Sequence, residues 1–490
     1  MAELRVLTPL RIESLAVGGA DVVGMGPDHA RRAGAALAAR LHPDTAVALV
    51  GVGGGLAADV GIGDLVVPTS LRSAEDDVEL ALPSAVLLEG ELRRAGARTH
   101  AGPVVSSPRY ARGAARASLA AGGSLAIDME SAFLAASLGA RPLAVVRAIS
   151  DTESCSPVRG GLRALRALRA VRGPLDRWAA ACGRRDVLLA APRSFCAGVE
   201  RAIEIVERAV GRFGAPVYVR RQIVHNLHVV RDLEEKGAIF VEELDEVPTG
   251  AVVVFAAHGV SPAVREDADA RGVTVIDATC PLVAKVHAEA RRFATHGYEI
   301  VLIGHRDHEE VEGTVGEAPE RTHVVATVEE VDGLRLARDT PVGVLTQTTL
   351  AVDEAERVRA AVRERFASVA EPPADDICYA TQNRQDAVRA IASRCDLLLV
   401  VGSQNSSNTA RLVELAEREG VRAELIEDAS QLELGWLPTA RTVGLTAGAS
   451  VPDSLVEGVL AALAHLGPLE IAEERVAEEA VRFALPGRVR

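Results

Sequence analysis

The chain has 490 residues, of which 48% are hydrophobic and 25% charged, a composition typical of soluble globular proteins with room for about three domains. The formal net charge of −14 argues against a protein held on nucleic acid by general electrostatics. The sequence shows neither a run of about 18 apolar residues, as a membrane span requires, nor a signal peptide. We therefore expect a cytoplasmic protein with reduced cysteines and no membrane span.

Patterning divides the chain into four segments. We expect an N-terminal domain over residues 1–158, a linker over 159–185, a second domain over 186–468 and a C-terminal tail over 469–490. The linker is rich in Arg and Ala, and its arginines recur at every third position from Arg163 to Arg172. Such a charge run is typical of a solvated helix.

The second domain contains a sequence repeat in three copies. Each copy opens with a cysteine directly before an amphipathic helix and closes with an apolar strand that ends in small polar residues. The opening cysteines are Cys196, Cys280 and Cys378, and the closing strands cover 253–259, 344–349 and 444–450. Alternating strands and helices predict parallel βαβ units, which bind ligands beyond the carboxyl ends of their strands. We expect three α/β units around a pseudo-threefold axis, with the cysteines at its centre.

Three cysteines at equivalent repeat positions predict a metal centre. A helix N-terminus favours the thiolate form, and three thiolates suit a cubane iron–sulfur cluster with one iron open to substrate. Zinc held by three cysteines is the alternative, although the short spacing typical of structural zinc is missing. Cys155, Cys182 and Cys395 have no counterparts in the repeat, and we expect them to be buried and inert.

Polar side chains at neighbouring repeat positions predict an anion site. The loop 304–313 combines two histidines with several carboxylates, and residues 404–408 open the second helix of the last copy. Hydroxyl, amide and backbone N–H groups at a helix N-terminus bind anions. Together with the histidines they would suit a phosphate or diphosphate. The histidines are His225, His258, His305 and His308.

The second domain, from Val187 to about Pro486, resembles the 4-hydroxy-3-methylbut-2-enyl diphosphate reductases. These enzymes catalyse the last step of non-mevalonate isoprenoid biosynthesis. Two positions depart from the family, since Ser194 stands where Gly is usual and Glu309 where Pro is frequent. The motifs that carry the resemblance cover residues 192–199, 224–226, 257–261, 277–281, 308–313, 346–349, 376–381, 405–408 and 447–450.

The resemblance implies one 4Fe–4S cluster per chain, held by Cys196, Cys280 and Cys378, and an allylic diphosphate substrate. Glu310 would be the proton source, with His308 and Thr348 placing it and the substrate hydroxyl. The products would be isopentenyl and dimethylallyl diphosphate, and the electrons would come from an external donor such as ferredoxin or flavodoxin. The implied diphosphate ligands are His225, His258, Ser406, Ser407, Asn408 and Ser450.

The N-terminal domain resembles the nucleoside phosphorylase and nucleosidase superfamily through its Gly-rich turns and through residues 128–131 and 147–151. The resemblance implies that Met129 and Glu130 bind ribose and that Asp151 protonates a purine leaving group. Glu13 is a candidate for the amino-terminal carboxylate of that superfamily, although no motif surrounds it. A nucleoside is therefore an expected ligand of this domain.

Three functions follow from these patterns. The leading one is an iron–sulfur reductase fused to a nucleoside-directed domain. In the second, the principal activity is a nucleoside phosphorylase or nucleosidase in the N-terminal domain. In the third, that domain is a regulatory module without catalysis. The expected fold is α/β, with a phosphorylase-like domain followed by three pseudo-threefold-related units around a central cluster.

Overall fold

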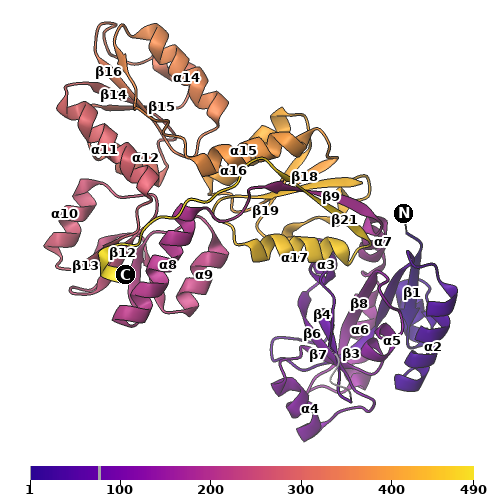
Figure 1. Ribbon diagram of the computed structural model, residues 1–490. Coiled ribbons are helices and arrows are strands. Elements are labelled where there is room, and N and C mark those ends of the chain that lie inside the picture. The colour runs from indigo at the N-terminus through magenta and orange to yellow at the C-terminus, as the bar shows by residue number, and fades with distance from the viewer. Residues whose placement is uncertain (1, 76–78) are drawn as a thin grey trace.

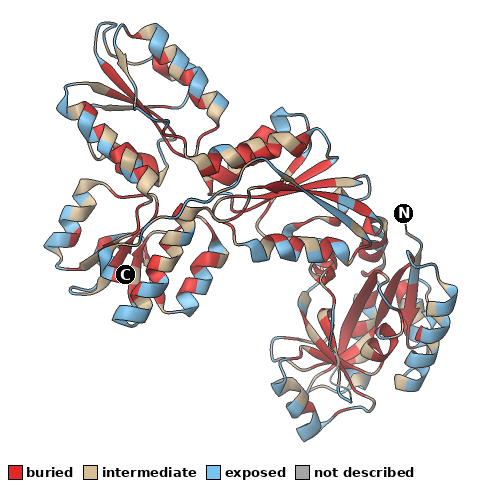
Figure 2. Ribbon diagram, in the orientation of Figure 1, coloured by how far each residue is buried: buried red, intermediate tan, exposed pale blue. Residues whose placement is uncertain are grey.

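The computed structural model describes residues 2–75 and 79–490, which form an N-terminal domain and three smaller α/β units (Figure 1). In each of them, strands rich in buried residues are flanked by helices that expose one face (Figure 2). No helix within these ranges is long and apolar enough to cross a membrane. The fold is α/β, as the alternation of strand and helix patterns predicts.

The N-terminal domain is built on one eight-stranded mixed sheet of order β2-β1-β3-β7-β6-β4-β5, with β8 paired to both β3 and β4. Strands β3 and β8 are almost continuously buried, as expected where both faces of a sheet are covered. The strands are β1 (Leu4–Thr8), β2 (Asp21–Val22), β3 (Ala46–Gly55), β4 (Leu65–Ser73), β5 (Glu79–Ala81), β6 (Thr99–Ser106), β7 (Ala126–Asp128) and β8 (Leu143–Asp151).

Seven helices accompany this sheet, and the last two correct the expected linker. Residues 159–185 are not a solvated connection, because α6 and α7 bury Leu168, Leu175 and Trp178 in the domain core. The sequence misses this packing because its arginines lie on the opposite, exposed face of α6. The helices are α1 (Arg11–Val17), α2 (Pro27–Arg40), α3 (Ala85–Arg94), α4 (Gly113–Ala121), α5 (Ser131–Ala135), α6 (Pro157–Leu168) and α7 (Arg172–Ala181).

The three units of the second domain share one sheet topology. Their parallel sheets have the orders β11-β10-β12-β13, β15-β14-β16-β17 and β19-β18-β20-β9. The strands are β9 (Arg185–Ala191), β10 (Val217–Arg220), β11 (Ala238–Val241), β12 (Val252–Phe255), β13 (Thr274–Asp277), β14 (Glu299–Ile303), β15 (Thr322–Val325), β16 (Val342–Thr346), β17 (Val369–Ala370), β18 (Leu397–Val401), β19 (Ala423–Ile426) and β20 (Thr442–Ala447).

The first strand of the second domain, β9, completes the sheet of the last unit. It takes the place that β13 and β17 hold in the other two sheets, so the ring of units closes on itself. Helices cover both faces of each sheet. They are α8 (Ala197–Phe213), α9 (Leu227–Glu235), α10 (Pro262–Ala270), α11 (Pro281–Thr295), α12 (Glu309–Val315), α13 (Val328–Asp332), α14 (Val352–Arg365), α15 (Tyr379–Ala392), α16 (Ser407–Arg418) and α17 (Asp453–Ala464).

The C-terminal segment belongs to the folded body rather than forming a separate tail. Strand β21 (Leu469–Arg475) pairs along β9 at the edge of the last sheet. The chain then crosses back to the first unit (Figure 1), where a short 3-10 helix, η4 (Gly487–Val489), buries Val489 in the core beside α8.

The N-terminal domain and the last unit share one hydrophobic core. This cluster runs from β3 and β8 through α7 to β18 and β20, and it includes Trp178 and Leu434. Helix α3 contacts the 3-10 helices η2 (Ala429–Gln431) and η3 (Leu434–Trp436). The Ser84 hydroxyl hydrogen-bonds to Nδ1 of His465 at 2.6 Å across the same junction. The first and second units have core clusters of their own.

Candidate active site

A cavity of about 110 Å³ lies where residues of all three units converge. It is lined by every residue that the family resemblance assigns to the second domain's site. His305 does not line it, although the sequence groups this residue with the other histidines. The predicted residues in the lining are Cys196, His225, His258, Cys280, His308, Glu310, Thr348, Cys378, Ser406, Ser407, Asn408 and Ser450.

Each of the three cysteines caps the N-terminus of a helix: Cys196 that of α8, Cys280 that of α11 and Cys378 that of α15. The backbone N–H of Thr381 donates to the Cys378 sulfur at 3.3 Å. Burial raises the pKa of Cys280 to about 11 and that of Cys378 to about 12, and the proximity of the other thiols adds to both shifts. The three sulfurs therefore lie close enough to one another to interact electrostatically.

The donor set consists of three thiols, which is compatible with a thiolate-bound cluster. Among residues 2–75 and 79–490, no group of three or more His, Cys, Asp or Glu side chains is placed to hold one metal ion. An iron–sulfur cluster instead spans several ångströms and takes thiolates from separate directions. Three thiols at three helix N-termini around one cavity meet that requirement, because the dipole of each helix favours the negative sulfur that faces it.

Three histidines form a second wall of the cavity. The rings of His225 and His258 stack with centroids 4.1 Å apart, and His308 stands edge-on to both at 5.7 and 5.9 Å. Burial, followed by the proximity of His258, lowers the pKa of His225 to about 2. Within the described chain, neither ring nitrogen of His225 has a hydrogen-bond partner. Buried ring nitrogens without a partner are typical of a site that binds a ligand.

Glu310 is the buried carboxylate of the site. Its Oε1 accepts a hydrogen bond from the Thr348 backbone N–H at 2.6 Å, and its Oε2 accepts one from the Thr348 hydroxyl at 3.0 Å. Burial raises the pKa of Glu310, and the bonds from Thr348 offset only part of that effect. His308 caps α12, where its Nδ1 accepts from the Glu310 backbone N–H at 3.2 Å. These contacts place a buried carboxyl group with a raised pKa at the cavity wall.

The remaining polar wall is the first turn of α16. Ser406 caps this helix, and Ser407 and Asn408 follow directly. Within the described residues, both side-chain polar atoms of Asn408 lack a partner although they are buried. Gln347 is a further residue beside this wall that the sequence did not single out. Its side-chain amide donates to the Thr349 hydroxyl at 2.9 Å and to the Ser407 hydroxyl at 3.3 Å. Its place in the motif of residues 346–349 is the only sequence signal for this residue.

Both departures from the family pattern have visible consequences. Ser194 adopts φ +61°, in the left-handed region where Gly carries no steric cost. Glu309 lies with its Oε2 3.3 Å from Nδ1 of His258. Burial opposes ionisation of Glu309, but the interactions with His258, followed by those with His225 and Arg221, outweigh it, and the pKa of Glu309 falls to about 2.

The other cysteines lie outside this cavity. Cys182 is buried and its thiol donates to the Trp178 carbonyl, while the Cys395 thiol donates to the Ile391 carbonyl at 3.2 Å. Cys155 and Cys395 are only partly buried, and Cys155 lies beside a different pocket, so the expectation of burial is wrong for these two residues.

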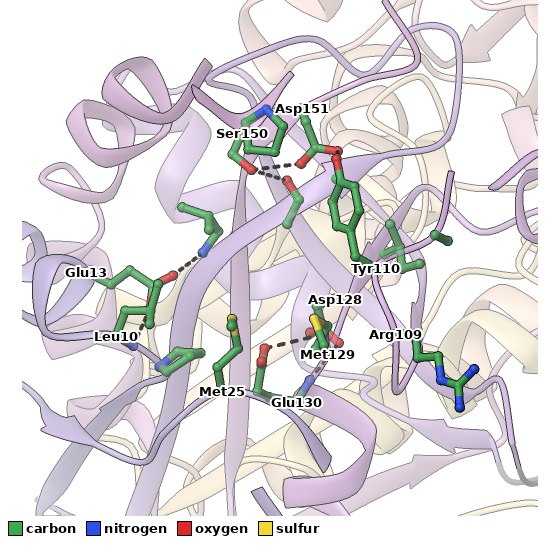
Figure 3. A pocket seen from close by; sticks show the side chains of 17 residues that line it. Leu10, Glu13, Met25, Arg109, Tyr110, Asp128, Met129, Glu130, Ser150 and Asp151 are labelled. Atoms are coloured by element: carbon green, nitrogen blue, oxygen red, sulfur yellow. Dashed lines mark hydrogen bonds between the residues drawn. The ribbon is translucent and has the colours of Figure 1, made fainter. Parts of the chain in front are cut away.

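The N-terminal domain has a cavity of about 210 Å³ of its own, lined by Glu13, Met129, Glu130 and Asp151 (Figure 3). Glu13 accepts hydrogen bonds from the backbone N–H groups of Val52 and Leu10 at 2.8 and 2.7 Å. Glu130 accepts one from the Gly26 N–H at 3.0 Å. Burial is the main cause that raises the pKa of Glu130 to about 7. The residues that resemblance assigns to nucleoside binding therefore meet in one place.

Asp151 is already engaged by the chain's own groups. Its Oδ2 accepts from Arg116 at 2.7 Å and from the Tyr110 hydroxyl at 3.0 Å, and its Oδ1 accepts from the Ser150 hydroxyl at 3.0 Å. Tyr110 and Asp151 face each other at the end of the cavity remote from Glu130 (Figure 3). The sequence offers no motif for Arg116 or Tyr110, because both lie far along the chain from Asp151.

Comparisons with known proteins agree with this division. The sequence model of the LytB protein family matches residues 187–464, and that of the phosphorylase superfamily matches residues 14–158. A 4-hydroxy-3-methylbut-2-enyl diphosphate reductase of Cutibacterium acnes is 56% identical over 311 residues, which cover 63% of this chain and 96% of that protein. A reductase of the same name from Burkholderia pseudomallei is 55% identical, over 62% of this chain and 97% of that protein.

A solved structure supports the same relationship. The E-1-hydroxy-2-methyl-but-2-enyl-4-diphosphate reductase of Plasmodium falciparum superposes with a TM-score of 0.61 and 38% identity, over 63% of this chain and 97% of that one. The family match covers more than half of the residues and contains all three cysteines and Glu310. The chain belongs to the LytB protein family and carries a phosphorylase-superfamily domain before the LytB region.

Proposed function

We propose that this chain converts 4-hydroxy-3-methylbut-2-enyl diphosphate to isopentenyl and dimethylallyl diphosphate by reductive dehydroxylation. The observation that carries this proposal is the single cavity that joins three cysteines, three histidines and a buried carboxyl group. The high identity to reductases of that name supports it.

The chain's own residues provide binding and proton transfer. The first turn of α16 and the unpartnered ring N–H of His225 would hold the diphosphate. The carboxyl proton of Glu310 would pass to the substrate hydroxyl oxygen, which leaves as water after uptake of two electrons and two protons. Thr348 and His308 hold Glu310 in place.

A 4Fe–4S cluster, held by Cys196, Cys280 and Cys378, would supply electrons from a ferredoxin- or flavodoxin-type donor and a Lewis-acidic iron for the hydroxyl group. The test is to purify the full chain without oxygen and to measure its iron, its acid-labile sulfide and its conversion of the diphosphate with a chemical reductant. Cys280→Ala should lose cluster and turnover, whereas Cys395→Ala should keep both. Full activity in Cys280→Ala would refute the proposal.

A second candidate function concerns the N-terminal cavity, which we infer to be a nucleoside-binding site. Glu130 and Glu13 offer carboxylates to ribose hydroxyls. The buried ion pair of Asp151 with Arg116 at 2.7 Å, together with the hydrogen bonds from Tyr110 and Ser150, favours binding without cleavage. Equilibrium binding of adenosine derivatives tests the site, and a purine-release assay with and without phosphate separates binding from catalysis.

A further inference from the structure

Each cysteine of the central cavity lies where the chain crosses from one unit to the next. Strand β9 belongs to the sheet of the last unit, but α8, which starts after Cys196, packs on β10 of the first unit. In the same way β13 and α11 flank Cys280, and β17 and α15 flank Cys378. Each unit therefore carries two cysteines, one before its first helix and one after its last strand. Each cysteine is thus shared by two neighbouring units, and each unit connects two of the three cysteines.

In the first unit, a basic side chain links the helix that follows Cys196 to the segment that precedes Cys280. Arg201 lies on α8, the helix that begins at Cys196. Its Nη1 donates to the carbonyl oxygens of Ala278 and Thr279, both at 3.1 Å. These two residues directly precede Cys280, so Arg201 ties the helix of one cysteine to the segment that carries the other.

The second unit repeats this contact with a lysine. Lys285 lies on α11, the helix that begins at Cys280. Its Nζ donates to the carbonyl oxygens of Ala374 and Asp375, both at 2.7 Å, and lies 3.3 Å from a carboxylate oxygen of Asp376. Asp376 stands two positions before Cys378. The cation again links the start of the unit to its end.

The last unit closes the ring with Arg384 on α15, the helix that begins at Cys378. This side chain is fully buried. Its Nη2 donates to the carbonyl oxygens of Ser194 at 2.6 Å and Phe195 at 3.3 Å, the two residues before Cys196. The loop it holds includes the left-handed φ of Ser194. Arg384 therefore stabilises a strained segment next to a cysteine.

We infer that Arg201, Lys285 and Arg384 are positioning residues that fix the separation of the two cysteines in each unit. They thereby fix the geometry of the cluster-binding site. This inference rests on the proposed reductase function. The three cations follow their cysteines by five or six positions, and each donates to two backbone carbonyl groups of the segment before the next cysteine. Because the three target segments differ in sequence, their common feature is the cysteine that follows.

The C-terminal segment reinforces two of these three links. Glu479 accepts from Arg384 Nη1 at 3.0 Å, and the Ala484 carbonyl accepts from Arg201 Nε at 2.8 Å. Each of these guanidinium groups therefore contacts both a cysteine loop and the C-terminal segment. We therefore expect Glu479→Gln to weaken the link of the last unit alone.

The experiment compares Lys285→Met, Arg201→Met and Arg384→Met in the full chain, purified without oxygen. Matched controls come from the same three helices. Arg208, Arg292 and Arg389 pair with Glu204, Glu289 and Asp386 on their own helices and are each replaced by Met. Iron and sulfide per chain, the rate at which visible absorbance is lost in air, and the electron paramagnetic resonance spectrum of the reduced protein are measured.

Loss of a link should accelerate cluster loss by about 10- to 100-fold, as removal of groups that orient metal ligands does elsewhere. The spectrum should also change, whereas the control variants should match the parent. Lys285→Arg and Arg384→Lys should keep more cluster than the Met variants, because they preserve a cationic donor. Lys285 is the decisive position because its side chain is 30% exposed, so that Met leaves the core intact.

The outcomes separate this inference from the proposed function. A parent protein without iron and sulfide would overturn the proposed function. A parent with cluster, together with Lys285→Met that loses cluster no faster than Arg292→Met, would overturn the positioning role. If Arg201→Met or Arg384→Met does not fold, the comparison of Lys285→Met with Arg292→Met decides the inference.

Discussion

Glu310 combines burial with two hydrogen bonds from a single neighbour, Thr348. Burial raises its pKa, which is the direction that suits a proton donor. We expect Glu310→Gln to lower kcat by about 10²- to 10⁴-fold, the usual contribution of a general acid, with iron content unchanged. Glu312→Gln is the matched control, since Glu312 lies on the same helix and pairs with Arg221 at the surface. Equal turnover of the two variants would exclude Glu310 as the donor.

Glu130 makes the N-terminal domain sensitive to pH. Its pKa of about 7 lies above its ordinary value, so the folded state binds more protons than the unfolded state between about pH 4.5 and 7. The free energy of unfolding must therefore fall as the pH rises through this window, by on the order of 2 kcal/mol. Glu130→Gln should remove this dependence. Urea unfolding of both proteins at pH 5 and pH 8 measures the difference, and parallel losses would contradict the shift.

At the scale of elements, the loop between β9 and α8 holds Ser194 at φ +61° with a buried hydroxyl that has no hydrogen-bond partner in the described chain. Ser194→Ala removes the hydroxyl and keeps the strained backbone, whereas Ser194→Gly removes both. We expect the Gly variant to be more stable than the Ala variant by about 1 kcal/mol, the cost of a left-handed conformation for a residue with a Cβ. Chemical unfolding checks this order, and a more stable Ala variant would reverse the argument.

The repeat made the three units predictable, because a cysteine before a helix and a closing strand recur in the same order. The closing strands are found as β12, β16 and β20. The motifs also predicted which side chains meet in the cavity, although their catalytic roles remain predictions. Local pattern suffices here because each of these residues sits at a strand end or helix start that the fold brings to the centre.

The contacts between elements could not be predicted. No pattern shows that β9 joins the last sheet, because strand pairing across most of a domain leaves no local trace. The links from Arg201, Lys285 and Arg384 end on backbone carbonyls, which every residue carries. Likewise, α6 and α7 looked like a solvated linker because their arginines face outward. A basic residue five or six positions after each cysteine was the only signal for the links.

The whole molecule is organised around the junction between the N-terminal domain and the last unit, rather than as two independent enzymes. The core of the N-terminal domain continues into the last unit, which carries α15 and hence the helix that Cys378 caps. Both tryptophans of the chain lie at this junction, Trp178 in α7 and Trp436 in η3. Opening of the junction therefore exposes apolar surface on the unit that helps to hold the cluster.

His465 makes the junction sensitive to acid. Burial lowers the pKa of His465 to about 4, so the unfolded state binds more protons than the folded state between about pH 6.5 and 4. The free energy of unfolding at the junction must then decrease as the pH falls through this window, by about 1–2 kcal/mol. Tryptophan fluorescence during urea unfolding should show this loss in the parent protein and a smaller one in His465→Asn, which can still accept from Ser84. Ser84→Ala, which breaks the hydrogen bond but keeps the titrating ring, should weaken the junction and retain the acid sensitivity. The same pH dependence in His465→Asn as in the parent would show that another group controls the junction.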